Sequence, residues 1–509
     1  MLSVVDTSPA PPCPNPFNLA FHVLAAAQRT PDKIALAVVG PAGADRWSYE
    51  RLATAVFGVA GAFAAQGFAP GARVLLRLGN TVEFPIAFLG AVAADLVPVP
   101  ISSQLTTPEV TDVCQQIDPV LIVADPTLPL PATSTPVIDL ARLTAWHAHP
   151  PVAPVAGDPD RPGYIVFTSG TSGRPRAVEH AHRAIWARQM MRDGWYGLHD
   201  DDRVLHAGAF NWTYTLGTGL MDPWAAGATA LIPAAGVSAS QIPLLLRRHD
   251  ATIFAAAPGV YRQLLKSPKP LDLPKLRHGL SAGEKMPDAL RAAWNDATGT
   301  QIYEAIGMSE CSTFVSGSPD CPAPEGTLGY AQDGRHIAVL GEDGAPVARE
   351  VPGTLAVHRS DPGLTLGYLG HAEETRARYV GEWFLTGDRV AMRQDGAITY
   401  LGRDDDMMNA GGYRVSPLEV EAALLTLPDI EEAAAVEVTV KADTTVIAAF
   451  YTAQNELDAD AISAHMSGLV ARYKAPRLFI HVDALPKSAN GKLVRRHLRQ
   501  SFEAQNGQA

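Results

Sequence analysis

The segment with the clearest chemical character is a run of small residues that follows the apolar stretch Tyr164–Phe167 and precedes Arg174 and Arg176. Glycines let backbone N–H groups converge on an anion, hydroxyls donate further hydrogen bonds, and arginines add positive charge. The run therefore predicts a phosphate-binding loop, although many Gly/Ser/Thr clusters are only surface loops. It lacks the Gly-Lys-Ser/Thr ending of a P-loop NTPase. Its small residues are Thr168, Ser169, Gly170, Thr171, Ser172 and Gly173.

Two further stretches carry groups that suit a nucleotide and a metal ion. The first is Ser281–Glu284, and the second runs from Tyr303 to Glu310. A flat ring suits a base, a hydroxyl such as that of Ser309 suits a phosphate oxygen, and a hard carboxylate suits Mg²⁺. Taken alone, Tyr303 would be a core aromatic residue and Glu310 a solvated carboxylate. Their position after the glycine-rich run favours a nucleotide site.

Three charged residues in the last quarter of the chain, Asp388, Arg403 and Lys492, complete the set of candidates. Asp388 ends the stretch Trp383–Asp388 and offers two acceptor oxygens, which suit a ribose diol. An aspartate after a glycine is more often a turn residue, so this interpretation also depends on Arg403. Lys492 follows Asn490-Gly491, a pair that forms a turn and projects the next side chain. Isolated lysines near a C-terminus are usually solvated.

Alternating helix-like and strand-like segments predict the elements that must position these groups. The alternation runs to about residue 340 and is typical of parallel sheets covered by helices. Shorter, glycine-punctuated β segments follow from Gly353, and the last ~100 residues have a compact α+β pattern. We therefore expect an α/β protein in which residues 1–404 form two sheet subdomains and a β-barrel-like unit. Residues 405–509 should form a small, mobile α+β domain that carries Lys492.

Composition excludes several classes of protein. The 509 residues carry a net charge of −12, which argues against a nucleic-acid binder because such a protein needs a basic face. The four cysteines lack metal-ligand or disulfide spacing, and the proline-rich start does not resemble a signal peptide. No apolar run reaches the ~20 residues of a membrane span. We expect a soluble cytoplasmic protein of undetermined oligomeric state.

Taken in order along the chain, these motifs resemble those of the adenylate-forming superfamily, which includes acyl-CoA synthetases, adenylation domains of peptide synthetases and luciferases. The resemblance covers nearly the whole length and is closest to benzoate-CoA ligases. It implies a reaction in which a carboxylate and ATP form an acyl-adenylate in the presence of Mg²⁺, after which coenzyme A takes the acyl group. The family's loop usually ends in Pro-Lys-Gly, whereas this one ends in Pro175-Arg176-Ala177. Arginine also binds phosphate.

The resemblance implies a role for each candidate. Arg176 would contact phosphate, Ser309 the α-phosphate and Glu310 Mg²⁺. Asp388 and Arg403 would hold the ribose side, and Lys492 would bridge the substrate carboxylate and the α-phosphate. The adenine side would be formed by Gly283, Glu284, Tyr303, Glu304 and Ala305.

The resemblance also implies an acyl pocket, a hinge and a thiol tunnel. Acetate-specific relatives carry tryptophan where this chain has Gly307, so we expect a deeper pocket and an aromatic or medium-sized acid. Asp405 would be the hinge, and Asn409 stands where the family often has lysine. The tunnel would include Gly411, Gly412 and Tyr413. The acyl pocket would be bordered by Trp212, Thr213, Tyr214, Ala257, Pro258, Ile306 and Gly307.

Two alternatives to a CoA ligase remain open at this stage. The first is a stand-alone adenylation enzyme that loads a carrier protein, although no carrier domain lies within these residues. The second is a non-catalytic nucleotide-binding paralogue, which the change to Arg176 makes conceivable. The histidine pairs His180/His182 and His147/His149 have no third ligand at suitable spacing, so we expect no metal there.

Overall fold

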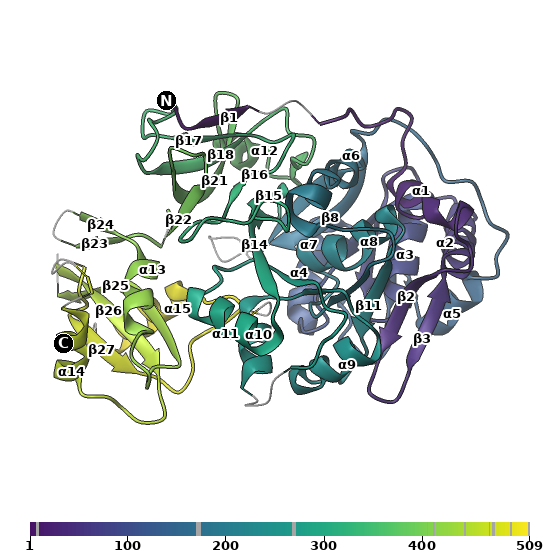
Figure 1. Ribbon diagram of the computed structural model, residues 1–509. Helices are drawn as coiled ribbons and strands as arrows, with labels where there is room; N and C mark the ends of the chain where they lie inside the picture. The colour runs from purple at the N-terminus through teal and green to yellow at the C-terminus, as the bar shows by residue number, and fades with distance from the viewer. Residues whose placement is uncertain are drawn as a thin grey trace. The chain divides into compact units, whose positions relative to one another are not determined.

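The computed structural model divides the chain into two compact units, each described here by itself (Figure 1). The large unit comprises Val5–His336 and His358–Glu382, and the small unit Met1–Val4, Ile337–Val357 and Trp383–Ala509. For residues 409, 410, 413, 414, 441, 444 and 506 the structure describes the backbone and not the side chain. The structure describes residues 1–6, 10–168, 175–266, 271–404, 406–410, 413–441, 444–467, 469–470, 474–488 and 491–506.

A nine-stranded sheet forms the centre of the large unit. Its strand order is β16-β15-β14-β13-β12-β10-β11-β2-β3, with parallel pairing from β14 to β2 and antiparallel edges. Inner strands such as β12 are buried along their whole length, because helices cover both faces. The strands are β2 (Ile34–Val39), β3 (Ala44–Ser48), β10 (Arg203–His206), β11 (Thr229–Pro233), β12 (Ile253–Ala255), β13 (His278–Ala282), β14 (Gln301–Met308), β15 (Ser312–Ser316) and β16 (Tyr330–Ala331).

A second parallel sheet has the order β5-β4-β6-β7, and helices α2 and α3 pack on each other beside it. The fit of these helices is close at Gly90, where a Cβ atom would lie 2.6 Å from Val59. Ser48 caps the N-terminus of helix α2, because its side chain accepts a hydrogen bond from the backbone N–H of Arg51. The elements are β4 (Arg73–Arg77), β5 (Val97–Pro100), β6 (Leu121–Ala124), β7 (Val137–Ile138), α2 (Tyr49–Ala64) and α3 (Glu83–Ala93).

A three-stranded antiparallel sheet, β19-β9-β8, completes the strand framework of the candidate site in the large unit. Strands β8 (Pro162–Thr168) and β9 (Arg176–Ala181) form a hairpin, and β19 (Gly367–Tyr368) pairs with β9. The glycine-rich run is therefore the connection of a hairpin.

The small unit contains antiparallel β structure followed by an α+β region. Strands β18 (Gly353–His358), β21 (Trp383–Met392) and β22 (Ile398–Arg403) belong to one sheet, as the glycine-punctuated pattern predicted. After them, β25, β26 and β27 form a separate sheet with hydrophobic clusters of its own. Its elements are β25 (Glu432–Lys441), β26 (Thr444–Thr452), β27 (Leu478–His481), α13 (Pro417–Leu424), α14 (Ala459–Met466) and α15 (Arg495–Asn506).

These features confirm the predicted α/β class with several sheets. The boundary at 404/405 stays a prediction, because Asp405 lies outside the described residues. Among the described helices, none is both long and apolar enough to cross a membrane.

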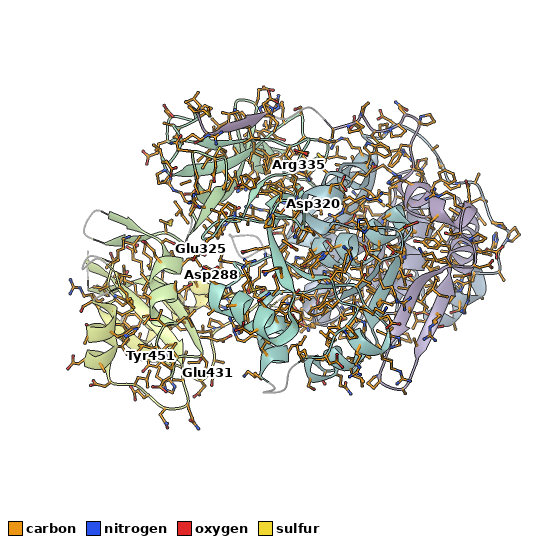
Figure 2. The ribbon with its side chains drawn as sticks, in the orientation of Figure 1. Asp288, Asp320, Glu325, Arg335, Glu431 and Tyr451 are labelled. Carbon is orange, nitrogen blue, oxygen red and sulfur yellow. The ribbon has the colours of Figure 1, made fainter. Side chains whose placement is uncertain are left out.

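Among the described residues of the large unit, two ion pairs are buried. Arg335, labelled in Figure 2, lies 2.7 Å from Asp361, and neither side chain is exposed. Arg188 lies 2.7 Å from Asp222 and is almost as deeply buried. A charge in the interior is tolerated only with a close partner, so each pair fixes the segments that carry it.

Buried histidines should make the protein sensitive to mild acid. Burial lowers the pKa of His22, His180 and His278 to about 4 and that of His182 and His206 to about 3. The unfolded chain, with histidine pKa values of about 6.5, binds more protons below that pH. The free energy of unfolding is therefore highest above about pH 6.5, where these histidines are neutral in both states. It decreases as the pH falls from 6.5 towards 4, because the unfolded chain then binds protons that the folded protein does not.

We expect the urea midpoint of unfolding to fall between pH 7 and pH 5, by an amount equivalent to roughly 1–2 kcal/mol for each of these histidines. Substitution of His278 by phenylalanine should flatten the pH dependence. An equal or higher midpoint at pH 5 would contradict this explanation.

Candidate active site

The two ends of the glycine-rich run lie opposite each other in the large unit. Thr168 at the end of β8 pairs with Arg176 at the start of β9. The predicted residues between them, 169–174, lie outside the described residues. The guanidinium of Arg176 is 5.3 Å from the ring centre of Tyr368 and 2.7 Å from the carboxylate of Glu374. The contact with Glu374 is an ion pair without hydrogen-bond geometry.

Tyr368 links the loop hairpin to the predicted metal ligand. Its hydroxyl donates a hydrogen bond of 2.7 Å to Oε1 of Glu310. The backbone carbonyl of Glu310 also accepts a hydrogen bond from the N–H of Thr365, three residues before Tyr368. Burial and the neighbouring carboxylate raise the pKa of Tyr368, which keeps the phenol protonated as the donor. A cation, a phenol and a carboxylate thus converge beside β9 and β19.

His180 holds the neighbouring residue Ser309. The Nε2–H of His180 on β9 donates a 2.8 Å hydrogen bond to the carbonyl oxygen of Ser309. Its ring stacks on Tyr164 with centres 4.8 Å apart, and burial lowers its pKa to about 4. The neutral ring therefore positions the turn that carries Ser309 and Glu310.

The side chains of Tyr303 and Glu304 point to opposite faces of β14. Glu304 is buried and accepts hydrogen bonds from Lys285 at 3.0 Å, Arg291 at 2.9 Å and the N–H of Met286 at 2.8 Å. It therefore fixes the loop that follows β13, where Gly283 has a φ of 98° that favours glycine. The predicted pair Gly283 and Glu284 is thus held in place by Glu304.

Tyr303 belongs to a different group of aromatic residues. Its ring meets that of His278 edge-on at 5.4 Å, and its carbonyl accepts a hydrogen bond from the indole of Trp195. It packs in the hydrophobic cluster that contains Tyr214, Trp212 and Ala305. The structure therefore places Tyr303 with the predicted acyl-pocket residues, on the opposite face from Glu304.

The predicted acyl-pocket residues lie in segments that follow β10 and β12 and on β14. Helix α7 (Thr213–Leu216) begins after Trp212, whose ring meets that of Tyr214 edge-on at 5.3 Å. The hydroxyl of Tyr214 donates to the carbonyl of Leu280 at 3.1 Å. Because β10 and β12 pair side by side, this segment starts next to helix α10 (Pro258–Leu265), capped by Ala257. Ligands commonly bind at such carboxyl ends of parallel strands.

The backbone leaves no room for a side chain at Gly307, whatever ligand binds nearby. A Cβ atom there would lie 2.2 Å from the carbonyl oxygen of Ser312, at an irregularity in the pairing of β14 with β15. A tryptophan at this position would break that pairing whatever its effect on the pocket. The depth of the acyl pocket therefore needs a test at another position, and it stays a prediction.

The predicted ribose residues face each other in the small unit. Asp388 on β21 pairs across the sheet with Arg403 on β22. The Oδ1 atom of Asp388 accepts from the hydroxyl of Tyr400 at 3.2 Å and from Arg403 at 3.4 Å. Burial raises the pKa of Asp388, while Arg403 and the hydrogen bonds oppose this shift.

Lys492 is the last residue of a closed turn in the small unit. The N–H of Ser488 donates to its carbonyl at 2.7 Å, and its own N–H donates to Oγ of Ser488 at 3.2 Å. Gly491 has a φ of 82°, as a turn residue before a projecting side chain requires. Three residues on, Arg495 forms ion pairs with Glu421 and Asp406.

Only some of the predicted hinge and tunnel residues lie among the described residues. Asp405, Gly411 and Gly412 lie outside the described residues. Tyr413 begins strand β24 (Tyr413–Val415), which pairs with β23 (Met408–Ala410), so that Asn409 faces Arg414 in the register.

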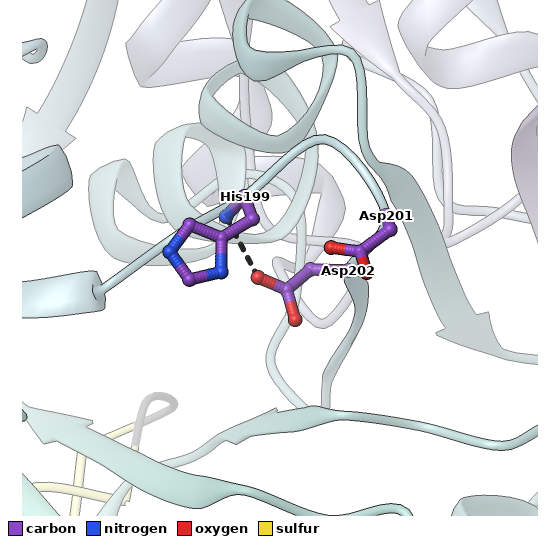
Figure 3. A group of neighbouring side chains, drawn as sticks. All are labelled: His199, Asp201 and Asp202. Atoms are coloured by element: carbon purple, nitrogen blue, oxygen red, sulfur yellow. Dashed lines mark hydrogen bonds between the residues drawn. The ribbon is translucent and has the colours of Figure 1, made fainter.

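Within the part of the chain that the structure describes, one cluster has the composition of a metal site, and Figure 3 shows its members His199, Asp201 and Asp202. The carboxylate of Asp202 already accepts from Arg277, Thr252 and the N–H of His199. These contacts explain its burial without an ion. The histidines His180 and His182 are likewise engaged, since the first bonds Ser309 and the second accepts from Leu19.

Sequence reasoning missed Tyr368, Tyr400 and His180 as site residues. Each acts through one long-range hydrogen bond, and such a contact leaves no local pattern. The sequence offered only weak signals for two of them. Tyr368 lies in the two-residue strand Gly367–Tyr368, and Tyr400 lies three residues before the candidate Arg403.

Comparison with known proteins shows the family of the chain. Residues 23–369 match the family described as AMP-binding enzyme, and residues 419–492 match the AMP-binding enzyme C-terminal domain. A benzoate–CoA ligase of Thauera aromatica is 31% identical, with 98% of this chain and 99% of that protein covered. A 4-hydroxybenzoate–CoA/benzoate–CoA ligase of Rhodopseudomonas palustris is also 31% identical, covering 89% of this chain and 88% of that protein.

Solved structures are similar over almost the whole chain. An anthranilate CoA ligase in complex with anthranoyl-AMP has a TM-score of 0.87 at 26% identity, covering 97% of this chain and 99% of that chain. A benzoate CoA ligase from Burkholderia xenovorans has a TM-score of 0.82 at 27% identity, covering 95% and 100%. The predicted enzyme class, an AMP-forming acyl-CoA synthetase, is confirmed by these relatives. The chain therefore belongs to the AMP-binding enzyme family, within the adenylate-forming superfamily.

Proposed function

We propose that the protein is an ATP-dependent carboxylate–CoA ligase that converts an acid, ATP and coenzyme A into acyl-CoA, AMP and diphosphate through an acyl-adenylate. The observation that carries this proposal is the convergence of Arg176, Tyr368 and Glu310 at the base of the glycine-rich hairpin. That arrangement combines a cation for phosphate with a carboxylate for a metal ion. The named activities of the relatives support the same reaction.

In adenylate formation the protein positions charged groups and forms no covalent bond to the substrates. A carboxylate oxygen of the acid attacks the α-phosphorus, and the bond to diphosphate breaks in line. Backbone N–H groups between Thr168 and Arg176 would hold the phosphates, and Ser309 would donate to an α-phosphate oxygen. Lys492 would neutralise charge between the two reacting anions.

Glu310 suits the Mg²⁺ that this chemistry requires. Its carboxylate is a hard oxygen ligand, and the hydrogen bond from Tyr368 to Oε1 fixes its orientation. When bound, the ion would supply positive charge to the phosphate oxygens. Tyr368 and the backbone bond from Thr365 hold Glu310 ready for this role.

Asp388 and Arg403 would bind the ribose side of the nucleotide. Two carboxylate oxygens can accept from a diol, and Arg403 fixes the carboxylate from the neighbouring strand. Tyr400 supplies a second hydrogen bond to the same oxygen. The side chain is thus oriented before the nucleotide arrives.

Thioester formation would follow after residues 405–509 change their orientation around Asp405. The hydrophobic clusters confined to residues 408–502 support a domain with its own core. A coenzyme A thiol would then attack the carbonyl carbon, and AMP would leave. Gly411, Gly412 and Tyr413 stay the proposed tunnel residues.

The acid is proposed to be aromatic or medium-sized. The aromatic rings of Trp212 and Tyr214 support this choice, as do the relatives named for benzoate, hydroxybenzoates and anthranilate. We also propose a cytoplasmic location, which is consistent with four cysteines that are all free thiols.

The proposed function can be tested with a screen of diphosphate release across short, medium, branched and aromatic acids. We expect benzoate-like acids to give the fastest release, and acyl-CoA to form only when coenzyme A is present. Acid-dependent AMP formation that coenzyme A does not accelerate would favour a carrier protein as the acceptor. Nucleotide binding without diphosphate exchange for any acid would overturn the proposal.

Replacement of Lys492 by alanine should separate the two half-reactions. We expect adenylate formation to fall by at least about 10²-fold, since one preorganised charge at a developing anion is worth that much. Thioester formation from supplied acyl-adenylate should stay near the wild-type rate. The matched control is Lys487→Ala, which removes a lysine already paired with Glu432 at 2.7 Å. Equal loss of both half-reactions in Lys492→Ala would refute the assignment.

Replacement of Tyr368 by phenylalanine should weaken the metal site without removing it. We expect the Mg²⁺ concentration for half-maximal activity to rise about tenfold, because an outer hydrogen bond to a ligand is worth that much. The same substitution in a Glu310→Gln background should have little further effect, since the two residues act as a unit. An unchanged Mg²⁺ dependence would show that Tyr368 does not act through Glu310.

A further inference from the structure

The turn that carries Glu310 closes on a serine with an unusual backbone conformation. The N–H of Cys311 donates to the carbonyl of Met308 at 3.2 Å, and the next residue, Ser312, pairs with Met308 across β14 and β15. Ser312 has a φ of 63°, in the left-handed region. A turn followed by one left-handed residue is a common hairpin connection, and glycine adopts that conformation without steric cost. The serine at this position therefore requires an explanation.

The hydroxyl of Ser312 has a charged and buried partner. Its Oγ accepts a hydrogen bond from the guanidinium of Arg188. The side chain of Arg188 is 4% exposed and also donates to both carboxylate oxygens of Asp222, at 2.8 and 2.7 Å. A hydrogen bond from a charged donor is stronger than one between neutral groups. This contact offsets the cost of the left-handed backbone at Ser312, and glycine could not supply it.

The arginine that holds Ser312 is closely enclosed. A Cβ atom at Gly217 would lie 2.0 Å from Nη2 of Arg188. The hydroxyl of Tyr196 accepts a hydrogen bond from the same nitrogen at 3.1 Å. Arg188 therefore has little room to shift, and the hydroxyl of Ser312 is bound to a rigid partner.

The turn is also held from another side. The carbonyl oxygen of Glu310 accepts a hydrogen bond from the N–H of Thr365 at 2.7 Å, and its Oε1 accepts from Tyr368 at 2.7 Å. Those two donors lie at β19 and just before it, whereas Arg188 belongs to a different segment of the large unit. The contact at Ser312 thus fixes the end of the turn that leads into β15, two residues after Glu310.

We propose that Ser312 is a positioning residue for the metal ligand. Its hydrogen bond with Arg188 holds the turn in the conformation in which the carboxylate of Glu310 binds Mg²⁺. The inference rests on the proposed function, in which Glu310 is the ligand of Mg²⁺ beside ATP. Residues that orient a metal ligand contribute to metal affinity without touching the ion. A strained residue at a functional site persists when the surrounding structure holds it, as Arg188 does here.

The test compares Ser312→Ala with Ser312→Gly. Both variants lose the hydroxyl, but glycine adopts the left-handed conformation readily and alanine does not. We therefore expect Ser312→Gly to have the higher urea midpoint of unfolding. If the hydroxyl positions Glu310, the two variants should lose the same metal affinity despite this difference in stability. A merely structural role would instead make metal affinity follow stability.

The measurement is the ratio of the Kd for ATP in EDTA to the Kd for ATP at saturating Mg²⁺, determined by calorimetry. This ratio reports how much the metal ion strengthens nucleotide binding, and it requires no catalytic turnover. We expect it to fall about tenfold in both variants, since outer partners of metal ligands are commonly worth that much. The KM for the acid should stay near the wild-type value, because Arg188 keeps its ion pair with Asp222.

The matched control is Ser316→Ala, four residues further along β15. The hydroxyl of Ser316 donates to the carbonyl of Gly194 at 2.7 Å, so this variant also loses a side-chain hydrogen bond. It should keep the wild-type ratio. A normal ratio in Ser312→Gly together with a reduced ratio in Ser312→Ala would overturn the role of the hydroxyl, and so would an unchanged ratio in both. If Ser312→Ala does not fold, the ratio in Ser312→Gly decides.

These outcomes are distinct from failure of the proposed function. A wild type whose ATP binding is not strengthened by Mg²⁺ would refute the metal role of Glu310 and, with it, this inference. A wild type that binds ATP more tightly with Mg²⁺ but releases diphosphate with no acid would refute the ligase proposal. In that case the ratios of the two Ser312 variants would still decide the role of Ser312.

Discussion

The buried ion pair of Arg188 with Asp222 is the constraint on which the arrangement of the large unit depends. The guanidinium donates to both carboxylate oxygens at 2.8 and 2.7 Å, to the hydroxyl of Tyr196 at 3.1 Å, and to Oγ of Ser312. Ser312 lies two residues after Glu310, and Asp222 follows the segment that begins with α7. One side chain therefore anchors both the acyl-pocket segment and the turn of the proposed metal ligand. Loss of either partner would leave an uncompensated charge, at a cost of about 3–5 kcal/mol.

Alternating side chains of β14 support two different parts of the site. Successive residues of β14 face opposite sides of the sheet, so Glu304 supports the loop after β13 while Tyr303 packs with Trp195 and Tyr214. The strand ends at the turn that His180 and Tyr368 hold from the loop hairpin. Groups proposed for nucleotide, metal and acid thus meet at the end of one strand, which is where parallel sheets commonly bind ligands.

Much of the fold and of the site could be predicted from the sequence, because both depend partly on patterns among residues that are close together in the chain. The alternation of strands and helices predicted the α/β class. The run around Gly170 predicted a loop between Thr168 and Arg176, and these two residues pair with each other in the hairpin. The contacts of Tyr368 and Arg188 could not be predicted, since each joins residues that are distant in the chain. The close approach of Gly307 to Ser312 depends on an irregular register that no composition reveals. The opposite faces of Tyr303 and Glu304 were readable from strand alternation alone.

The arginine at the start of β9 has a chemical consequence beyond charge. A mixed anhydride of an acid and AMP is an acylating agent, and it reacts with any amine that offers a free electron pair. An arginine guanidinium keeps its proton throughout the pH range of folded proteins, whereas a lysine releases its proton for a small fraction of the time. If the proposed intermediate forms beside Arg176, this cation can bind it without being consumed by self-acylation. The exchange of a flexible amine for a planar, inert one would thus favour the durability of the catalyst over many turnovers.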